Sequence, residues 1–392
     1  MLVRLRPYVH IIILCICWYA ISSFASQVTK QVLTLCPLPL FLGEFQFIYT
    51  ALLAAISCNI AYYSSRFCAF FPKGTFPQYV SHGYANRKII TRPTKKIFIT
   101  VLPLGIFQFV GKYFGHTATS IVPVSTVASI KTLSPIFILI FQKLLGLKTL
   151  ALDSILYFSL GSLITGVWII VNEDNKATKK GNDLMVATYS TYGIICAIIS
   201  MFIFVGQNIY GKKVFTYKSN PTDIDNLRNY DSQKADSPLP VYADKKEYKE
   251  EYRDDEPVTY DKLTLMIYIS LVGFCMSFGW FIMLELPLIW GYIFNGTSTE
   301  LIKCMPWKLY FLNGTFHFLQ AMITFYLMGE VSTLTYSIAN LMKRIAIISV
   351  SWIFVGRMIT FHQVFGLLLN VFGLFLYERC SSQRKKFKGR ME

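Results

Sequence analysis

The chain has 392 residues, of which 54% are hydrophobic and 16% aromatic, and its mean hydropathy is +0.45. A soluble domain this apolar would lack the polar surface needed to cover itself, so the composition indicates a polytopic helical membrane protein surrounded by lipid. The formal net charge of +16 does not indicate nucleic acid, because the basic residues lie mostly between apolar runs, without an aromatic-interleaved basic face. The nine cysteines show neither disulfide nor metal-ligand spacing, so we expect no metal and no other cofactor.

The amino-terminal segment carries Arg4 and Arg6 and then stays apolar and aromatic for longer than a cleaved signal peptide does. It is therefore predicted to be the first membrane helix, acting as a signal anchor. No Arg- and Ser-rich transit segment precedes it, which argues against a plastid destination.

Apolar runs of about 20 residues, the length that crosses a bilayer as a helix, occur ten times. They cover residues 8–26, 39–63, 97–115, 120–145, 151–171, 183–209, 262–290, 307–328, 331–355 and 359–378. The pattern leaves open whether 97–145 holds one helix or two, because Pro103, Pro123 and Pro135 would each kink or end a helix. The chain then divides into six helices over 1–210, a charged loop over 211–261, four helices over 262–378 and a basic tail over 379–392.

Lysine and arginine placement predicts the orientation. The links at 64–96 and 211–261 and the tail are rich in basic residues, so we expect them, and both termini, to be cytosolic. The glycosylation sequon at Asn295 then falls on the lumenal side. Residues 218–260 lose apolar periodicity and are rich in Asp, Glu, Lys, Pro and Tyr, which is typical of a disordered linker or of a segment regulated by phosphorylation.

The two halves of the chain resemble each other in pattern. Val124 to Lys131, followed by Gly146, is matched by Val331 to Lys343, followed by Gly356. The next run in each half contains two glycines, Gly161 and Gly166 in one and Gly366 and Gly373 in the other. Since five is odd, a duplicated set of five helices would be inverted in the second copy, with a binding site near the membrane midplane.

Three cations stand where hydrocarbon is expected. Lys343 and Arg344 lie near the middle of one apolar run, and Lys131 lies in the corresponding run of the first half. Such charges cost several kcal/mol in lipid, so they require a water-filled cavity or anionic partners, unless the helix ends are misplaced and the side chains snorkel. Glu44 and Glu285 lie nearer the ends of their runs. The cations therefore predict a site for an anion such as phosphate, and a site that is unfavourable when empty suits obligate exchange.

Helical spacing places six further polar residues near these cations, as candidates to bind a sugar hydroxyl or a phosphate. They are Asn340, Tyr336, His317, Gln320, Lys112 and His116. For each one alone, an interhelical hydrogen bond is an equally good interpretation.

The segment SIANLMKRIAIISVSWIFVGRMITFHQVFGLLLNVFGLFLYER resembles the carboxy-terminal signature of the triose-phosphate translocator family, which belongs to the drug/metabolite transporter group. VSTVASIKTLSPIF and the Phe45, Gln46, Phe47 triplet resemble two other segments of that family. The resemblance implies a ten-helix, inverted-repeat fold that exchanges phosphorylated metabolites or nucleotide sugars. It also implies phosphate-binding roles for Lys131, Lys343 and Arg344.

Two departures from the plastid pattern weaken triose phosphate as the cargo. Gln320 stands where plastid members carry a substrate-binding Tyr, and Lys112 lies near where they carry His. With its charged loop, the chain looks more like the fungal members of the endoplasmic reticulum, or else of the Golgi.

Two other functions stay open at this point: a nucleotide-sugar transporter, and a membrane regulator that acts through residues 211–261 without transporting anything. An enzyme is not expected. No Ser/His/Asp, paired-carboxylate or Cys/His arrangement lies at one depth, and no phosphate-cradling Gly loop is visible.

Overall fold

The computed structural model describes residues 6–71, 75–77, 89–90, 93, 95–144, 154–178, 184–215, 261–295, 305–330, 333–356 and 359–388. Within these ranges the regular structure is helical and there is no strand, which confirms the all-α class. Most of the predicted charged loop, residues 216–260, lies outside the described residues.

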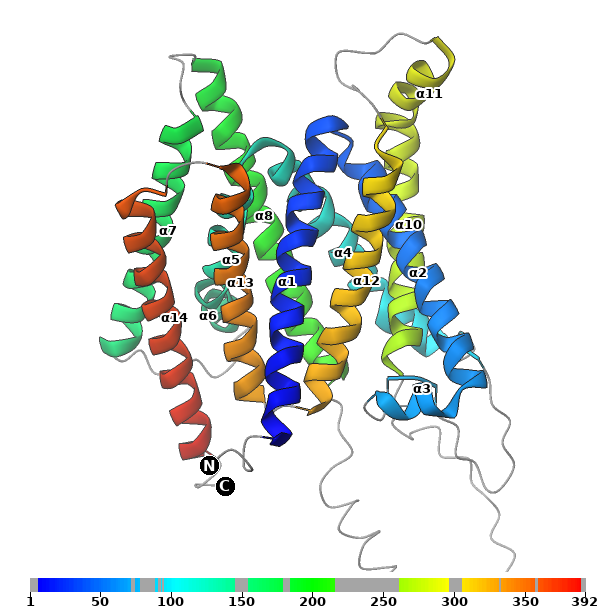
Figure 1. The fold of residues 1–392 in the computed structure, drawn as a ribbon, viewed down its shortest axis with the longest axis horizontal. Helices are drawn as coiled ribbons and strands as arrows, with labels where there is room; N and C mark the ends of the chain where they lie inside the picture. The colour runs from blue at the N-terminus through cyan, green and yellow to red at the C-terminus, as the bar shows by residue number, and fades with distance from the viewer. Residues whose placement is uncertain are drawn as a thin grey trace, which may run out of the picture.

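Ten long helical segments, two of them interrupted, run roughly alongside one another (Figure 1). They are α1 (Arg6–Leu35), α2 (Pro39–Tyr63), α4 (Lys95–Ile121), α5 with α6 (Val124–Thr132, Ser134–Leu144), α7 (Ser154–Thr178), α8 (Leu184–Phe215), α10 with α11 (Lys262–Leu284, Leu286–Asn295), α12 (Trp307–Glu330), α13 (Thr333–Val355) and α14 (Phe361–Lys388), and the short α3 (Ser65–Phe70) follows α2. Nine of the segments in the described ranges are long and apolar enough to span a membrane, so this is an integral membrane protein. The tenth, α12, has 24 residues but is more polar, because Asn313, His317 and Gln320 lie along it.

Residues 97–145 form two crossings. The first, α4, ends at Ile121, and Pro123 is the N-cap residue of the next helix, α5. The second is interrupted between Thr132 and Ser134, next to Pro135, while Pro103 is accommodated inside α4. Prolines therefore mark the turn between the two crossings and the break inside the second one.

Three helices extend furthest beyond their predicted apolar runs. The first apolar run continues as helix to Leu35 rather than ending near residue 26, because the polar side chains beyond it, such as Gln27, are buried against other helices. The fifth, α7, runs to Thr178 because the buried Asp174 accepts hydrogen bonds from neighbouring helices. The last, α14, continues through the first part of the predicted tail to Lys388.

Most of the larger helix contacts are kept when helices one to five are exchanged with six to ten. The pair α1–α12 corresponds to α4–α8, α2–α12 to α4–α10, and α5–α7 to α13–α14; three further pairs, α2–α10, α5–α13 and α7–α14, exchange into themselves. In Figure 1, α1 starts at the end of the bundle where α14 finishes, whereas its counterpart α8 starts at the opposite end. The two halves are therefore related as inverted repeats.

Helices α7 and α14 approach closely through glycines. A Cβ on Gly166 would lie 2.7 Å from the Gly366 carbonyl oxygen, and one on Gly366 would lie 3.0 Å from that of Gly166. Ser159 Oγ and Ser162 Oγ donate across the same contact to the Gly373 and Leu369 carbonyls, both at 2.8 Å. Of the four glycines that the sequence places in these two helices, three serve helix packing, and Gly161 faces open space.

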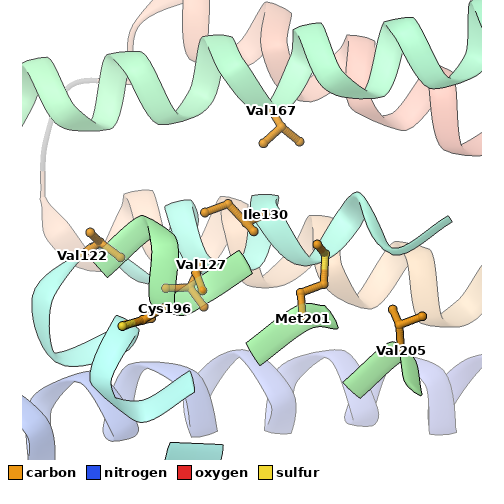
Figure 2. Packing of buried hydrophobic residues seen from close by; sticks show 9 residues of the cluster. Val122, Val127, Ile130, Val167, Cys196, Met201 and Val205 are labelled. Carbon is orange, nitrogen blue, oxygen red and sulfur yellow. The ribbon is translucent and has the colours of Figure 1, made fainter. Parts of the chain in front are cut away.

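An apolar cluster positions α5, the helix that carries Lys131. Val127 and Ile130 of α5 pack with Val167 of α7 and with Cys196 and Met201 of α8 (Figure 2). All five side chains are almost fully buried. Tight packing fixes the rotation of α5 about its axis and so the position of Lys131, which interacts with Arg344 of α13.

Candidate functional site

The break in the fourth crossing creates the first part of the site. In a continuous helix the Lys131 carbonyl would accept from the backbone nitrogen of residue 135, but that residue is Pro and has no N–H. Arg344 of α13 supplies a donor instead, since its Nη1 donates to the Lys131 carbonyl and, at 2.9 Å, to Ser134 Oγ. A cation at the carboxyl end of α5 is also favoured by the helix dipole.

Lys343 lies next to Arg344 but faces a different helix. Its Nζ lies 4.2 Å from the ring centroid of Trp18 of α1, and Trp18 in turn stacks on Tyr336 at 5.9 Å. Trp18 is fully buried, and its Nε1 has no hydrogen-bond partner within the described part of the chain. Within the described ranges, the contact of the Lys343 ammonium is this ring face, which is weaker than an ion pair.

Lys112 of α4 makes the same kind of contact with another aromatic ring. Its Nζ lies 4.3 Å from the ring centroid of Phe47 of α2, and its side chain is 7% exposed. One turn later, His116 Nε2 lies 3.3 Å from Gln46 Oε1, while on α12 His317 Nδ1 lies 3.4 Å from Thr50 Oγ1.

Electrostatic interactions join these groups into one cluster. His317 interacts with Lys112 and His116, and His116 interacts with Lys131. Lys131 interacts with Arg344, and both interact with Lys343. Tyr336 interacts with Arg344. The structure therefore brings together seven of the nine predicted site residues, from α4 and α5 in the first half and α12 and α13 in the second.

Three of the cations, Lys131, Lys343 and Arg344, interact with one another. All three lie deep in the protein, and each keeps part of its surface accessible. No ion pair joins any of the three to a carboxylate in the described ranges.

Another cation, Lys30, shows the opposite behaviour. Lys30 of α1 donates from Nζ to the carbonyls of Thr119, Ser120 and Val122 at 2.8, 3.0 and 3.2 Å. These carbonyls end α4, where a helix leaves acceptors unused. Lys30 is therefore fully hydrogen-bonded and serves the fold.

The two remaining predicted residues, Gln320 and Asn340, are not joined to the cluster by any described side-chain contact. Gln320 uses only its backbone carbonyl, which accepts from Thr324 Oγ1 at 2.7 Å, and both side chains are half-buried. Asn295 ends α11, and the rest of its sequon lies outside the described residues. No group of three or more metal-ligating side chains occurs in the ranges the structure describes.

Sequence reasoning missed several residues of the cluster: Trp18, Phe47, Thr50 and Asn313 were not among the site candidates, and Gln46 was noted only for its resemblance to a family segment. Polar residues inside apolar runs are a signal that could have found Gln46 and Asn313. No signal in the chain distinguishes Trp18 or Phe47 from the many aromatic residues that pack or face lipid.

Comparison with known proteins places the chain among membrane transporters. The Triose-phosphate Transporter family matches residues 9–235 and 240–378. A Saccharomyces cerevisiae protein named uncharacterized transporter YJL193W is 61% identical, over 97% of this chain and 96% of its own length. Uncharacterized transporter SLY41 of the same organism is 32% identical over 96% and 81%. The chloroplastic xylulose 5-phosphate/phosphate translocator of Arabidopsis thaliana is 24% identical over 75% of this chain and 58% of its own.

Proposed function

Because the chain belongs to the Triose-phosphate Transporter family, we propose that it exchanges a phosphorylated sugar for inorganic phosphate by alternating access. One observation carries the proposal: Lys131, Lys343 and Arg344, drawn from both halves, lie close together without a carboxylate partner in the described ranges. Cations that the protein leaves unpaired are completed by an anionic ligand.

Phosphate is the anion that best fits these donors. Arg344 offers a planar fork and the two lysines offer point charges, the combination that binds phosphate oxygens from several directions. The name of the Arabidopsis relative, a translocator of xylulose 5-phosphate and phosphate, supports the same class of cargo here.

The partners of these cations favour exchange over one-way transport. Without an anion, the cations repel one another, and within the described ranges their contacts are ring faces, one carbonyl and one hydroxyl. A carrier that must change conformation with these charges unpaired faces a higher barrier than a loaded one, so loaded crossings dominate in both directions.

The test is exchange in proteoliposomes filled with inorganic phosphate and offered labelled phosphate outside. We expect uptake in the wild type only when an anion is inside, loss of uptake in Lys343→Ala, and normal uptake in Lys308→Ala, a matched change at an exposed lysine at the start of α12. Xylulose 5-phosphate, glucose 6-phosphate, dihydroxyacetone phosphate and GDP-mannose would compete in parallel.

The competitors decide between cargo classes. If GDP-mannose is exchanged and the sugar phosphates are not, the protein is a nucleotide-sugar transporter. If nothing is exchanged by folded protein, while Lys343→Ala still supports the cellular role and deletion of residues 216–260 abolishes it, the protein is a regulator that acts through this segment.

We propose the endoplasmic reticulum as its membrane, with the Golgi as the alternative, and both ends of the chain in the cytosol. The start of α1 and the end of α14 lie at the same end of the bundle (Figure 1), as ten crossings require. Glycosidase treatment tests the orientation: a mobility shift that Asn295→Gln removes supports a lumenal α11 end, and a shift unchanged by Asn295→Gln contradicts the use of that sequon.

A further inference from the structure

A run of buried hydrogen bonds leads from α1 to His116, and its direction is set at its α1 end. Thr29 Oγ1 donates to the Ala25 carbonyl at 2.8 Å, so its only hydrogen is used. The same oxygen lies 2.7 Å from Asn313 Nδ2 and must accept there, and the Ala25 carbonyl also accepts from Nδ2 at 3.4 Å. A carbonyl cannot donate, so the amide nitrogen of Asn313 faces α1.

The orientation of the Asn313 amide determines that of the Gln46 amide. With its nitrogen toward α1, Asn313 presents Oδ1 to α2, where Gln46 Nε2 donates to it at 2.7 Å. Gln46 must then present Oε1 to α4. Both amides are buried, with 1% and 3% of their surface exposed, so neither can turn over and pair with water instead.

His116 receives the end of the run. Its Nε2 lies 3.3 Å from Gln46 Oε1, and an amide oxygen only accepts, so Nε2 carries the hydrogen. In a neutral imidazole the other nitrogen, Nδ1, then holds a lone pair. Nδ1 makes no hydrogen bond to any residue in the described ranges.

The surroundings of His116 favour the neutral ring. Lys112 on its own helix and Lys131 on α5 act on it, and His317 on α12 interacts with it; Gln46 on α2 is uncharged. No carboxylate is among these groups. A neutral imidazole between two lysines avoids a third positive charge and keeps Nδ1 as an acceptor.

The cations of the cluster supply no acceptor. Lysine and arginine side chains only donate, which suits phosphate oxygens, whereas a sugar hydroxyl also needs an acceptor for its hydrogen. We infer that Gln46, held by Asn313, is a positioning residue that keeps the His116 proton on Nε2 and so presents Nδ1 to a hydroxyl of the carried sugar. This inference rests on the proposed function for the identity of the cargo.

The tautomer can be measured without transport. Full-length protein labelled with ¹⁵N-histidine in lipid nanodiscs gives distinct nitrogen shifts for each tautomer, and His116→Gln assigns the signal. We expect an Nε2–H tautomer in the wild type and in Gln207→Leu, which removes a comparable amide pair between α8 and α4 (2.8 Å to Gln108). In Gln46→Leu we expect both tautomers. An Nδ1–H or doubly protonated ring in the wild type, or an unchanged signal in Gln46→Leu, overturns the inference.

The hydroxyl contact is tested by exchange. In phosphate-loaded proteoliposomes, Gln46→Leu should raise KM for glucose 6-phosphate about tenfold, the effect of losing one hydrogen bond in a site built for it, and leave KM for phosphate nearly unchanged. One monodeoxy glucose 6-phosphate should be discriminated against by the wild type and not by Gln46→Leu. Equal losses for phosphate and sugar phosphate would mean that Gln46 is structural only. If the wild type exchanges no anion, the proposed function and the hydroxyl contact both fail, while the tautomer measurement still decides what Gln46 does to His116.

Discussion

Two buried carboxylates of this protein and its clustered cations are partnered in opposite ways. Glu285 accepts from the backbone N–H groups of Leu40 and Phe41 at 2.9 and 2.6 Å, where α2 begins. Asp174, near the end of α7, accepts from two α5 hydroxyls and from Gln363 of α14. The clustered cations, by contrast, face aromatic rings, a carbonyl, a hydroxyl and one another.

The difference separates groups that hold the fold from groups that bind. A buried charge whose hydrogen bonds are all made by neutral protein groups is stable without ligand and connects helices. A buried charge with unmade hydrogen bonds does not stabilise the fold and gains a partner only when ligand binds. Lys30 donates hydrogen bonds to three carbonyls, so the sign of the charge does not cause the difference. The cause is whether the hydrogen bonds of the charged group are complete.

The largest effect is expected where an incomplete charge is removed. Lys343→Ala should lower the exchange rate by a hundredfold or more, since losing one partner of a buried ion pair with the anion costs about 2–5 kcal/mol. The same change should leave the thermal unfolding midpoint unchanged or raised, because it removes repulsion from Arg344 and Lys131. Exchange in proteoliposomes and thermal unfolding in detergent measure the two. A lowered midpoint would assign Lys343 to the fold.

The reverse outcome is expected where a completed charge is removed. Asp174→Ala leaves the hydroxyls of Ser125 and Thr126 and the amide of Gln363 without their acceptor, at a cost of about 2–3 kcal/mol of unfolding free energy. Thermal unfolding should show a clearly lower midpoint, and exchange per folded molecule should remain near that of the wild type. Asp174→Asn keeps one acceptor oxygen, so its unfolding midpoint should lie between those of the wild type and of Asp174→Ala.

Arg344→Lys separates charge from geometry. Lysine keeps the positive charge but lacks the fork that reaches both the Lys131 carbonyl and Ser134 Oγ at the α5–α6 break. We expect about a tenfold lower exchange rate, the effect of roughly 1.4 kcal/mol. A rate equal to that of the wild type would show that charge alone is needed at this position.

The smallest effect is expected for Trp18→Phe. The ring face under Lys343 Nζ remains, but phenyl binds a cation less strongly than indole does, by a fraction of the roughly 1 kcal/mol such contacts contribute. KM for phosphate should therefore rise about twofold, with the maximal rate unchanged. Trp168→Phe, at an exposed position on α7, is the control and should change neither value.

The helices and the mid-membrane cations could be predicted because they depend on local properties of the chain. Hydropathy over about 20 residues locates a crossing, and a lysine inside such a run is visible without any partner. The two halves, their inversion and Lys131, Lys343 and Arg344 follow from runs and spacings read in order. The errors lay at helix ends, as at Asp174, where burial of one polar side chain extends a helix beyond its apolar run.

Which residues meet could not be predicted, because the contacts join positions far apart in the chain. Arg344 donates to the carbonyl of Lys131, 213 residues away. Pro135 leaves this carbonyl without its usual helical donor, and Arg344 can reach it only because α13 packs against α5. Gln46 and Asn313 are 267 residues apart, and their orientation depends on a hydroxyl of a third helix. Hydrogen bonds are short and directional, so a polar residue in a membrane helix acquires its role from the group that packing places opposite it.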